Sequence, residues 1–193
     1  MSDEDFVPMD LQKAIIRAGE AVAEANPDRR LTVVSQLLSD THYVMANDYI
    51  HDLFQNVISN AVKFDSSKHV RVDVSIAEEA TVSGASWVLS FADHGRGIPD
   101  ERKTAVFERF ATGMTGIKGF GLGLSIVKSI VDKFGGRIWV VDRVKGDFTK
   151  GTVFKIVLPR APAPATEGKA TSSPSSSTQE PPSPDQNEEE PDA

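Results

Sequence analysis

The stretch GFGLGLSIVKSI, residues 119–130, places glycines at every second position and then runs directly into an amphipathic helical pattern. The first N–H groups of a helix lack partners within the helix, and its N-terminal end carries a partial positive charge. Gly119, Gly121 and Gly123 let the preceding backbone wrap an anion closely. The spacing matches neither G-x-G-x-x-G nor G-x-x-x-x-G-K-[ST]. We therefore expect a polyphosphate-binding loop of another kind before a helix from about Leu122 to Phe134.

The composition excludes several functions. The 193 residues include no cysteine, which rules out a disulfide, a thiolate nucleophile or a cysteine-bound metal. No apolar run approaches the roughly 20 residues that span a bilayer, and no N-terminal segment resembles a signal peptide. We expect a soluble, cytoplasmic chain that makes no membrane contact of its own.

The charge of the chain is unevenly distributed. Of the formal net charge of −7, residues 161–193 carry −6, and they also hold seven of the eleven prolines and the run SSPSSST. Such a composition buries too little apolar surface to fold, so we expect one folded domain over residues 1–160 and a disordered acidic tail over residues 161–193. The remaining near-neutral domain has no basic stripe, which argues against nucleic acid as a partner.

The order of the periodic segments predicts the fold class. VPMDL is expected to be a short strand whose Asp10 caps a helix, and LTVVS and HYVMA are expected to be strands before a helix over residues 48–64. HVRVDVSI and SWVLSFAD alternate as an antiparallel pair joined by the loop EEATVSGA, and a short helix follows DHGRGIPDER. RIWVVDRV and GTVFKIVLP form a second pair. We expect an α+β sandwich in which helices cover one face of a single mixed, mostly antiparallel sheet.

The helix DYIHDLFQNVISNAVKF carries an unusual polar face. Its apolar residues form a complete i, i+3, i+4 stripe, and Asp52, Asn56, Asn60 and Lys63 fall on another face. Asparagine is unfavourable inside a helix because it competes for backbone hydrogen bonds. An amide oxygen suits a hard cation and a lysine one turn on suits phosphate, so this face fits a Mg²⁺-nucleotide. From this helix alone, however, a plain exposed polar face is the better explanation.

The segment FADHGRGIPD delivers a carboxylate at the end of a strand. A carboxylate accepts hydrogen bonds, so Asp93 suits an exocyclic amino group such as that of adenine. Gly95 and Gly97 let the backbone approach a flat ring, and Ile98 would form its apolar floor.

Together these segments resemble the ATP-binding domain of sensor histidine kinases, in the superfamily shared with DNA gyrase, a mismatch-repair ATPase and a heat-shock chaperone. NVISNAVKF is similar to its N box, DHGRGIP to its first glycine box, FERF to its F box and GFGLGLSIV to its second glycine box. The order and spacing also match, over roughly residues 6–159. The resemblance implies a Bergerat-type two-layer sandwich that binds ATP and Mg²⁺.

The resemblance also implies a role for each matching residue. Asp93 would bind the adenine amino group, Asn60 would ligate Mg²⁺, and Asn56 and Lys63 would contact phosphates. Phe107 to Lys118 would form a mobile lid, in which Arg109 and Lys118 would meet the γ-phosphate. The remaining nucleotide contacts would come from Gly95, Gly97, Ile98, Phe107, Phe110, Gly119, Gly121, Leu122, Gly123 and Leu124.

The N box separates the possible mechanisms. Gyrase-like relatives carry Glu at the place of Asn56, where it can act as a base, which asparagine cannot. We therefore expect transfer of the γ-phosphate to a histidine on a separate or missing dimerisation and phosphoacceptor hairpin, and through it indirectly to a response regulator. None of the four histidines resembles that acceptor. The alternatives are a stand-alone ATP-binding regulatory module and a slow gyrase-like ATPase.

Overall fold

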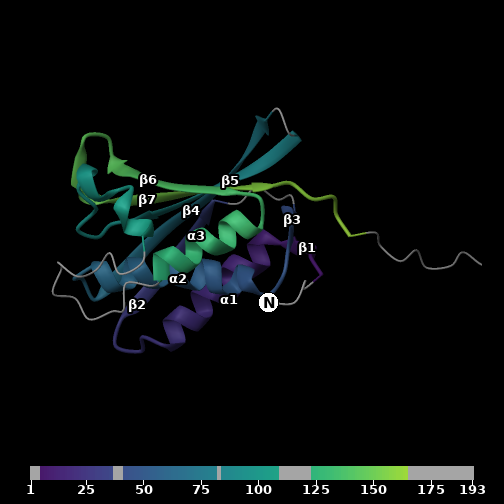
Figure 1. Ribbon diagram of the computed structural model, residues 1–193. Coiled ribbons are helices and arrows are strands. Elements are labelled where there is room, and N and C mark those ends of the chain that lie inside the picture. The colour runs from purple at the N-terminus through teal and green to yellow at the C-terminus, as the bar shows by residue number, and fades with distance from the viewer. Residues whose placement is uncertain (1–4, 37–40, 82–83, 109–122, 165–193) are drawn as a thin grey trace, which may run out of the picture.

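The computed structural model describes residues 5–36, 41–81, 84–108 and 123–164. Within these ranges three helices lie against one face of a five-stranded sheet (Figure 1). The helices are α1 (Leu11–Glu24), α2 (Tyr49–Phe64) and α3 (Gly123–Lys133). The strand order is β2 (Arg30–Gln36), β4 (His69–Thr81), β5 (Gly84–Asp93), β7 (Asp147–Pro159) and β6 (Arg137–Val144), and only the pair β2–β4 is parallel. The predicted α+β sandwich with a mixed, mostly antiparallel sheet is confirmed.

Two short strands form a sheet of their own, which the sequence analysis did not separate from the main one. β1 (Val7–Asp10) pairs antiparallel with β3 (Tyr43–Ala46). α1 follows β1 at once, and α2 follows β3 after two residues. Asp10 ends β1 and caps α1 as predicted, because its Oδ1 accepts the N–H of Gln12 at 2.9 Å. β3 also meets the chain after β7, through a bridge between Val44 and Arg160.

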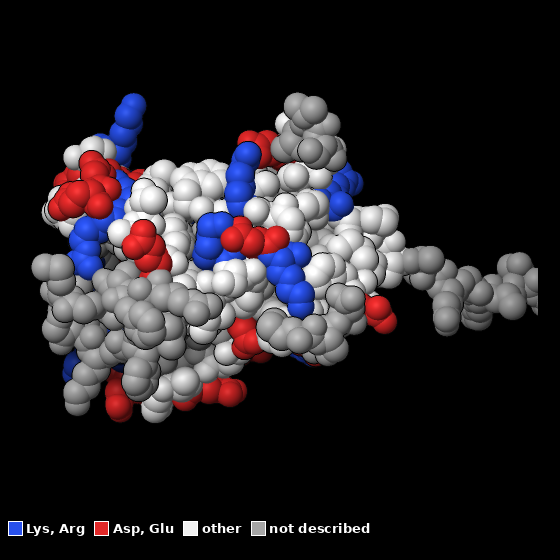
Figure 2. All heavy atoms as spheres, viewed as in Figure 1, with Lys and Arg blue, Asp and Glu red and all other residues white. Residues whose placement is uncertain are grey.

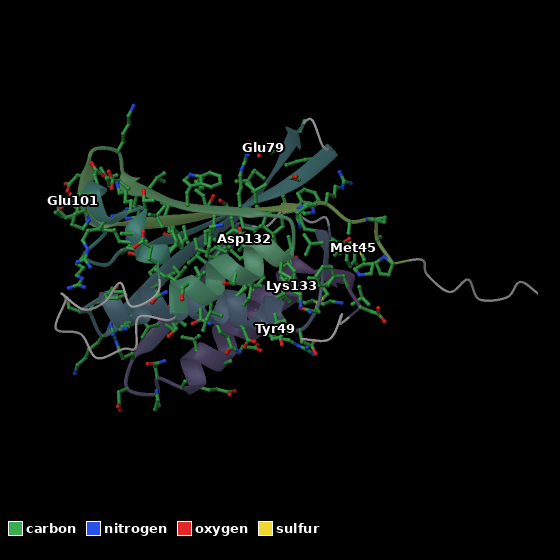
Figure 3. All side chains as sticks on the ribbon, in the orientation of Figure 1. Met45, Tyr49, Glu79, Glu101, Asp132 and Lys133 are labelled. Atoms are coloured by element: carbon green, nitrogen blue, oxygen red, sulfur yellow. The ribbon has the colours of Figure 1, made fainter. Side chains whose placement is uncertain are left out.

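The core lies between the helices and the sheet. Every residue predicted to face inward from β4 and β5 is buried: Val70, Val72, Val74, Ile76, Trp87, Leu89 and Phe91. The apolar stripe of α2 meets them, and the rings of Phe54 and Phe91 lie 5.5 Å apart between centroids. α3 runs beside α2, and the Lys133 ammonium lies 5.3 Å from the centre of the Tyr49 ring (Figure 3). The burial of the apolar face of α2 therefore fixes the position of this helix, and with it the position of its polar face.

The β4–β5 hairpin is longer than the sequence predicted. Residues 78–85 were expected to be a loop, but the ladder continues to the pair Thr81↔Gly84. The ribbon extends beyond the helices (Figure 1), so neither face there requires apolar residues and the alternation that marks a strand is lost. Ion pairs of Glu78 with Arg160 and of Glu79 with Arg137 hold the ribbon at 2.7 and 2.6 Å.

Two further segments differ in detail from expectation. The short helix predicted after DHGRGIPDER is a pair of 3₁₀ turns, η1 (Asp100–Arg102) and η2 (Ala105–Phe107). At the end of β7, Ala161 is buried and its N–H donates to the Tyr43 carbonyl at 2.8 Å, so the packed chain continues at least to this residue. From residue 165 onward the predicted tail lies outside the described residues. Among the described helices, none has the length and apolar character needed to cross a membrane.

Two glycines allow the cost of an unfavourable backbone conformation to be distinguished from the cost of a steric clash. Gly151 (φ +108°) and Gly84 (φ +120°) both adopt a conformation that disfavours side chains. A Cβ on Gly151 would stand 2.2 Å from the Asp93 carbonyl oxygen, whereas one on Gly84 would meet nothing within 4 Å. We expect Gly84→Ala to lower the free energy of unfolding by about 1 kcal/mol and Gly151→Ala by roughly 2–4 kcal/mol. Urea unfolding of both variants checks this, and equal losses would contradict the close contact.

Candidate nucleotide-binding site

Asp93 at the end of β5 is the most buried charged group of the site, with 9 % of its surface exposed. Its Oδ1 accepts two backbone N–H groups, from Gly95 at 2.9 Å and from Thr152 at 3.2 Å. Burial raises the pKa of the carboxyl, and these two hydrogen bonds oppose that rise. Since both bonds end on Oδ1, Oδ2 has no hydrogen-bond donor among the described residues and is left to accept one from a ligand.

The loop after Asp93 is held between α2 and β7. The N–H of Arg96 donates to the Phe64 carbonyl at 3.3 Å, and a Cβ on Gly95 would stand 2.9 Å from that same oxygen. Gly97 has a φ of +69°, and its Cβ would stand 1.6 Å from the Phe148 carbonyl oxygen. Only glycine fits at either position, and Ile98 after them packs against the core. The backbone on both sides therefore fixes the shape of this loop.

The polar face of α2 meets the start of α3. The Asn56 side chain donates its Nδ2–H to the Asp52 carbonyl at 2.8 Å. Its Oδ1 would lie 3.0 Å from a Cβ on Gly123, so this amide and the beginning of α3 are neighbours. Helix geometry leaves the first N–H groups of α3 without partners inside the helix. The structure thus brings together two of the sequence-predicted motifs, the N box and the second glycine box.

Asn60 provides a test of whether a cation and a nucleotide fit here. Its Nδ2 is buried and has no hydrogen-bond partner among the described residues. A buried amide without a partner is costly, and rotating it by 180° would place the oxygen where the nitrogen is now. An oxygen there, one helical turn from Asn56 and near Lys63, suits a hard cation that carries phosphates. The donor set therefore fits Mg²⁺ and a polyphosphate.

The remaining predicted site residues divide into two groups. Phe107 and Leu124 are partly buried and pack against the core, at the two ends of the segment that joins η2 to α3. Six predicted residues lie outside the described residues: Arg109, Phe110, Lys118, Gly119, Gly121 and Leu122.

The sequence analysis missed the contribution of β7. Thr152 is buried and holds Asp93 through its backbone N–H, and Gly151 lets the two chains approach. A main-chain donor leaves no side-chain signature. The available signal was the glycine that opens GTVFKIVLP inside a strand, where glycine often marks a close backbone approach.

Comparison with known proteins agrees with this geometry. Residues 45–162 match the family model for histidine kinase-, DNA gyrase B- and HSP90-like ATPases. That match covers more than half of the chain, which therefore belongs to this family. Within it the chain is similar to the ATP-binding catalytic domains of sensor histidine kinases, and the predicted identity of the domain is confirmed.

Three relatives illustrate the similarity. The histidine-protein kinase/phosphatase MprB of Mycolicibacterium vanbaalenii is 38 % identical over 60 % of this chain and 23 % of its own length. The sensor histidine kinase AruS of Pseudomonas aeruginosa is 35 % identical over 72 % of this chain and 14 % of its own. In structure, a mycobacterial MprB sensor kinase aligns with a TM-score of 0.65 and 30 % identity, over 82 % of this chain and 99 % of that one. The chain thus spans less than a quarter of the full length of these two curated relatives.

The buried carboxyl of Asp93 predicts a pH-dependent stability. Because folding raises its pKa, the ionised form lowers the stability of the folded state at neutral pH, and this penalty disappears as the pH falls through the folded pKa toward 3.8. In Asp93→Asn the amide oxygen still accepts from Gly95 and Thr152 without a charge. We expect this variant to be more stable than the wild type at pH 7 and to lose that advantage as the pH falls toward 4. Thermal unfolding at both pH values checks the sign, and a constant difference would contradict it.

Proposed function

We propose that this domain binds Mg-ATP and donates the γ-phosphate to a histidine on a separate dimerisation and phosphoacceptor hairpin, as part of a two-component signalling system. The observation that carries the proposal is the Oδ2 of the buried residue Asp93, which has no hydrogen-bond donor among the described residues. Asp93 begins the loop that is bonded to the Phe64 carbonyl of α2, the helix that carries Asn56 and Asn60. In this role Asp93 orients the base, Asn60 holds the metal, and Asn56 and Lys63 position the phosphates. Arg109 and Lys118 would supply further charge from the lid.

Asn56, which stands where gyrase-like relatives carry a glutamate, supports transfer rather than hydrolysis. Asn56 cannot take a proton from water, and its amide is already engaged with the Asp52 carbonyl. Phosphoryl transfer depends mainly on positioning and on neutralising charge, and these are the properties of the residues that line this site. When bound, the metal would neutralise phosphate charge beside Asn60.

Three of the four described histidines are poorly suited to accept a phosphate, and the fourth, the exposed His69, begins β4 and lies on no helix. His51 lies on α2 itself, one turn before Asn56, and His42 is 3 % exposed beneath Trp87. The Nε2 of His94 lies 2.8 Å from a carboxylate oxygen of Asp73. The acceptor is therefore proposed to lie on another segment or chain, and a response regulator would receive the phosphate from it.

Base selectivity tests the role of Asp93. Its Oδ2 can accept from the adenine amino group but faces an acceptor oxygen in guanine, so ATP should bind roughly 5- to 150-fold more tightly than GTP. In Asp93→Asn an NH₂ donor takes the place of Oδ2, which should weaken ATP by a similar factor and narrow the preference over GTP. Calorimetric titration measures both nucleotides. Asp132→Asn, an exposed carboxylate paired with Lys128, is the matched control, and equal ATP and GTP affinities in the wild type would refute the assignment.

Phosphate transfer tests the proposed reaction. With γ-labelled ATP the chain alone should remain unlabelled and hydrolyse slowly, whereas its cognate histidine-bearing hairpin added as a separate polypeptide should be labelled weakly, because two chains lack the effective concentration of one. Asn60→Ala should abolish this labelling, and Ser59→Ala, an exposed residue of the same helix, should leave it unchanged.

Three results would count against the proposed transfer. Rapid labelling of the chain itself would place the acceptor within this chain. Brisk phosphate release would indicate a gyrase-like ATPase. An unlabelled cognate hairpin despite tight ATP binding would favour a regulatory module that binds nucleotide without transfer.

A further inference from the structure

A hollow of about 420 Å³ opens between the end of α2 and the loop after β5. Lys63, Phe64 and Asp65 line it from the helix side, and His94 and Arg96 line it from the loop. Of the lining residues, Lys63 and Gly95 were assigned to nucleotide binding from the sequence. Arg96 lies between the two glycines of the first glycine box.

Two cations in the hollow converge on one aromatic ring. The Lys63 ammonium lies 5.2 Å and the Arg96 guanidinium carbon 4.9 Å from the centre of the Phe64 ring. The ring attracts both cations and holds the exposed Arg96 side chain against the wall of the hollow. The backbone of Arg96 is fixed as well, by its hydrogen bond to the Phe64 carbonyl.

Neither cation has a carboxylate partner among the described residues. This sets them apart from several other cations, since Arg71, Arg137 and Arg160 lie 2.6–2.7 Å from carboxylate oxygens. On the described surface that Figure 2 shows, basic side chains likewise lie beside acidic ones in several places. A pair of unpaired cations that face a hollow is a site for an anion.

The other ionisable groups of the hollow are engaged elsewhere. The Oδ1 of Asp65 accepts the N–H of Ser67 at 2.7 Å. The Nε2 of His94 lies 2.8 Å from Asp73, whose other carboxylate oxygen pairs with Arg71 at 2.7 Å. The carboxylate of Asp65 keeps its negative charge and offsets one of the two cations, so Lys63 and Arg96 together leave the lining with an excess of positive charge.

On the basis of the proposed nucleotide site, we infer that Arg96 is a phosphate-binding residue that acts together with Lys63. Arg96 lies three residues after Asp93, and Lys63 lies one helical turn after Asn60. A nucleotide held at both Asp93 and Asn60 lies between the elements that carry these cations, so its negative groups are the anion that the geometry favours. The planar guanidinium supplies two parallel donors to phosphate oxygens, and the Phe64 ring holds it in place before the ligand arrives.

Arg96→Gln and Arg96→Lys test this role against uncharged and charged ligands. We expect Arg96→Gln to weaken Mg-ADP by roughly 3- to 10-fold, with partial recovery in Arg96→Lys, and to leave adenosine unchanged. The affinity of Arg96→Gln for Mg-ADP should also fall less steeply with salt than that of the wild type. Arg137→Gln removes the same charge at the far side of the sheet and should change neither ligand. Calorimetry gives the Mg-ADP affinities, and competition against Mg-ADP gives those for adenosine.

The outcomes separate this inference from the proposed function. A wild-type chain that does not bind Mg-ADP overturns both. If the wild type binds and Arg96→Gln binds equally well, only the role of Arg96 is overturned. An equal loss for adenosine would place Arg96 at the base or ribose and would also overturn a role at phosphate.

Discussion

The whole site depends on the two backbone hydrogen bonds that Asp93 accepts on one oxygen. They require the loop after β5 and the first half of β7 to lie in direct backbone contact, which glycine at positions 97 and 151 permits. The same contacts leave the second carboxylate oxygen to a ligand. One packing arrangement therefore fixes both the fold at this end of the sheet and the direction in which the site accepts a hydrogen bond.

α2 contributes to stability and function through opposite faces. Its apolar stripe, with Phe54 against Phe91, is fully buried and contributes to the largest cluster of the core. Because that face is fixed, residues at intervals of three and four on the other face are fixed too, and Asn56, Asn60 and Lys63 follow one another along the site. The internal asparagines weaken the helix locally, and the packing of the other face compensates for them.

Much of this arrangement could be predicted from the sequence because it rests on periodicity and on side chains. The stripe of α2, the alternation of β4 and β5, and the carboxylate at Asp93 are all readable in this way, and the amide of Asn56 does meet the start of α3 at Gly123. Backbone donors are not readable, so Thr152 was missed. The long β4–β5 hairpin was missed because a ribbon beyond the helices needs no apolar face. Arg96 was missed because a single cation on a loop forms no pattern in the sequence. The role proposed for it depends on Phe64 and Lys63, which lie across the hollow.

Several features of the unliganded domain carry an energetic cost that a nucleotide would relieve. Burial disfavours the charged carboxylate of Asp93, the buried amide nitrogen of Asn60 has no partner among the described residues, and Lys63 and Arg96 hold two like charges near one ring. An unsatisfied buried polar group typically costs about 1–3 kcal/mol. In the proposed complex, a ligand with an amino group at one end and a metal-phosphate at the other would give each of these groups a partner. A ligand that lacks either end would forgo part of that free energy.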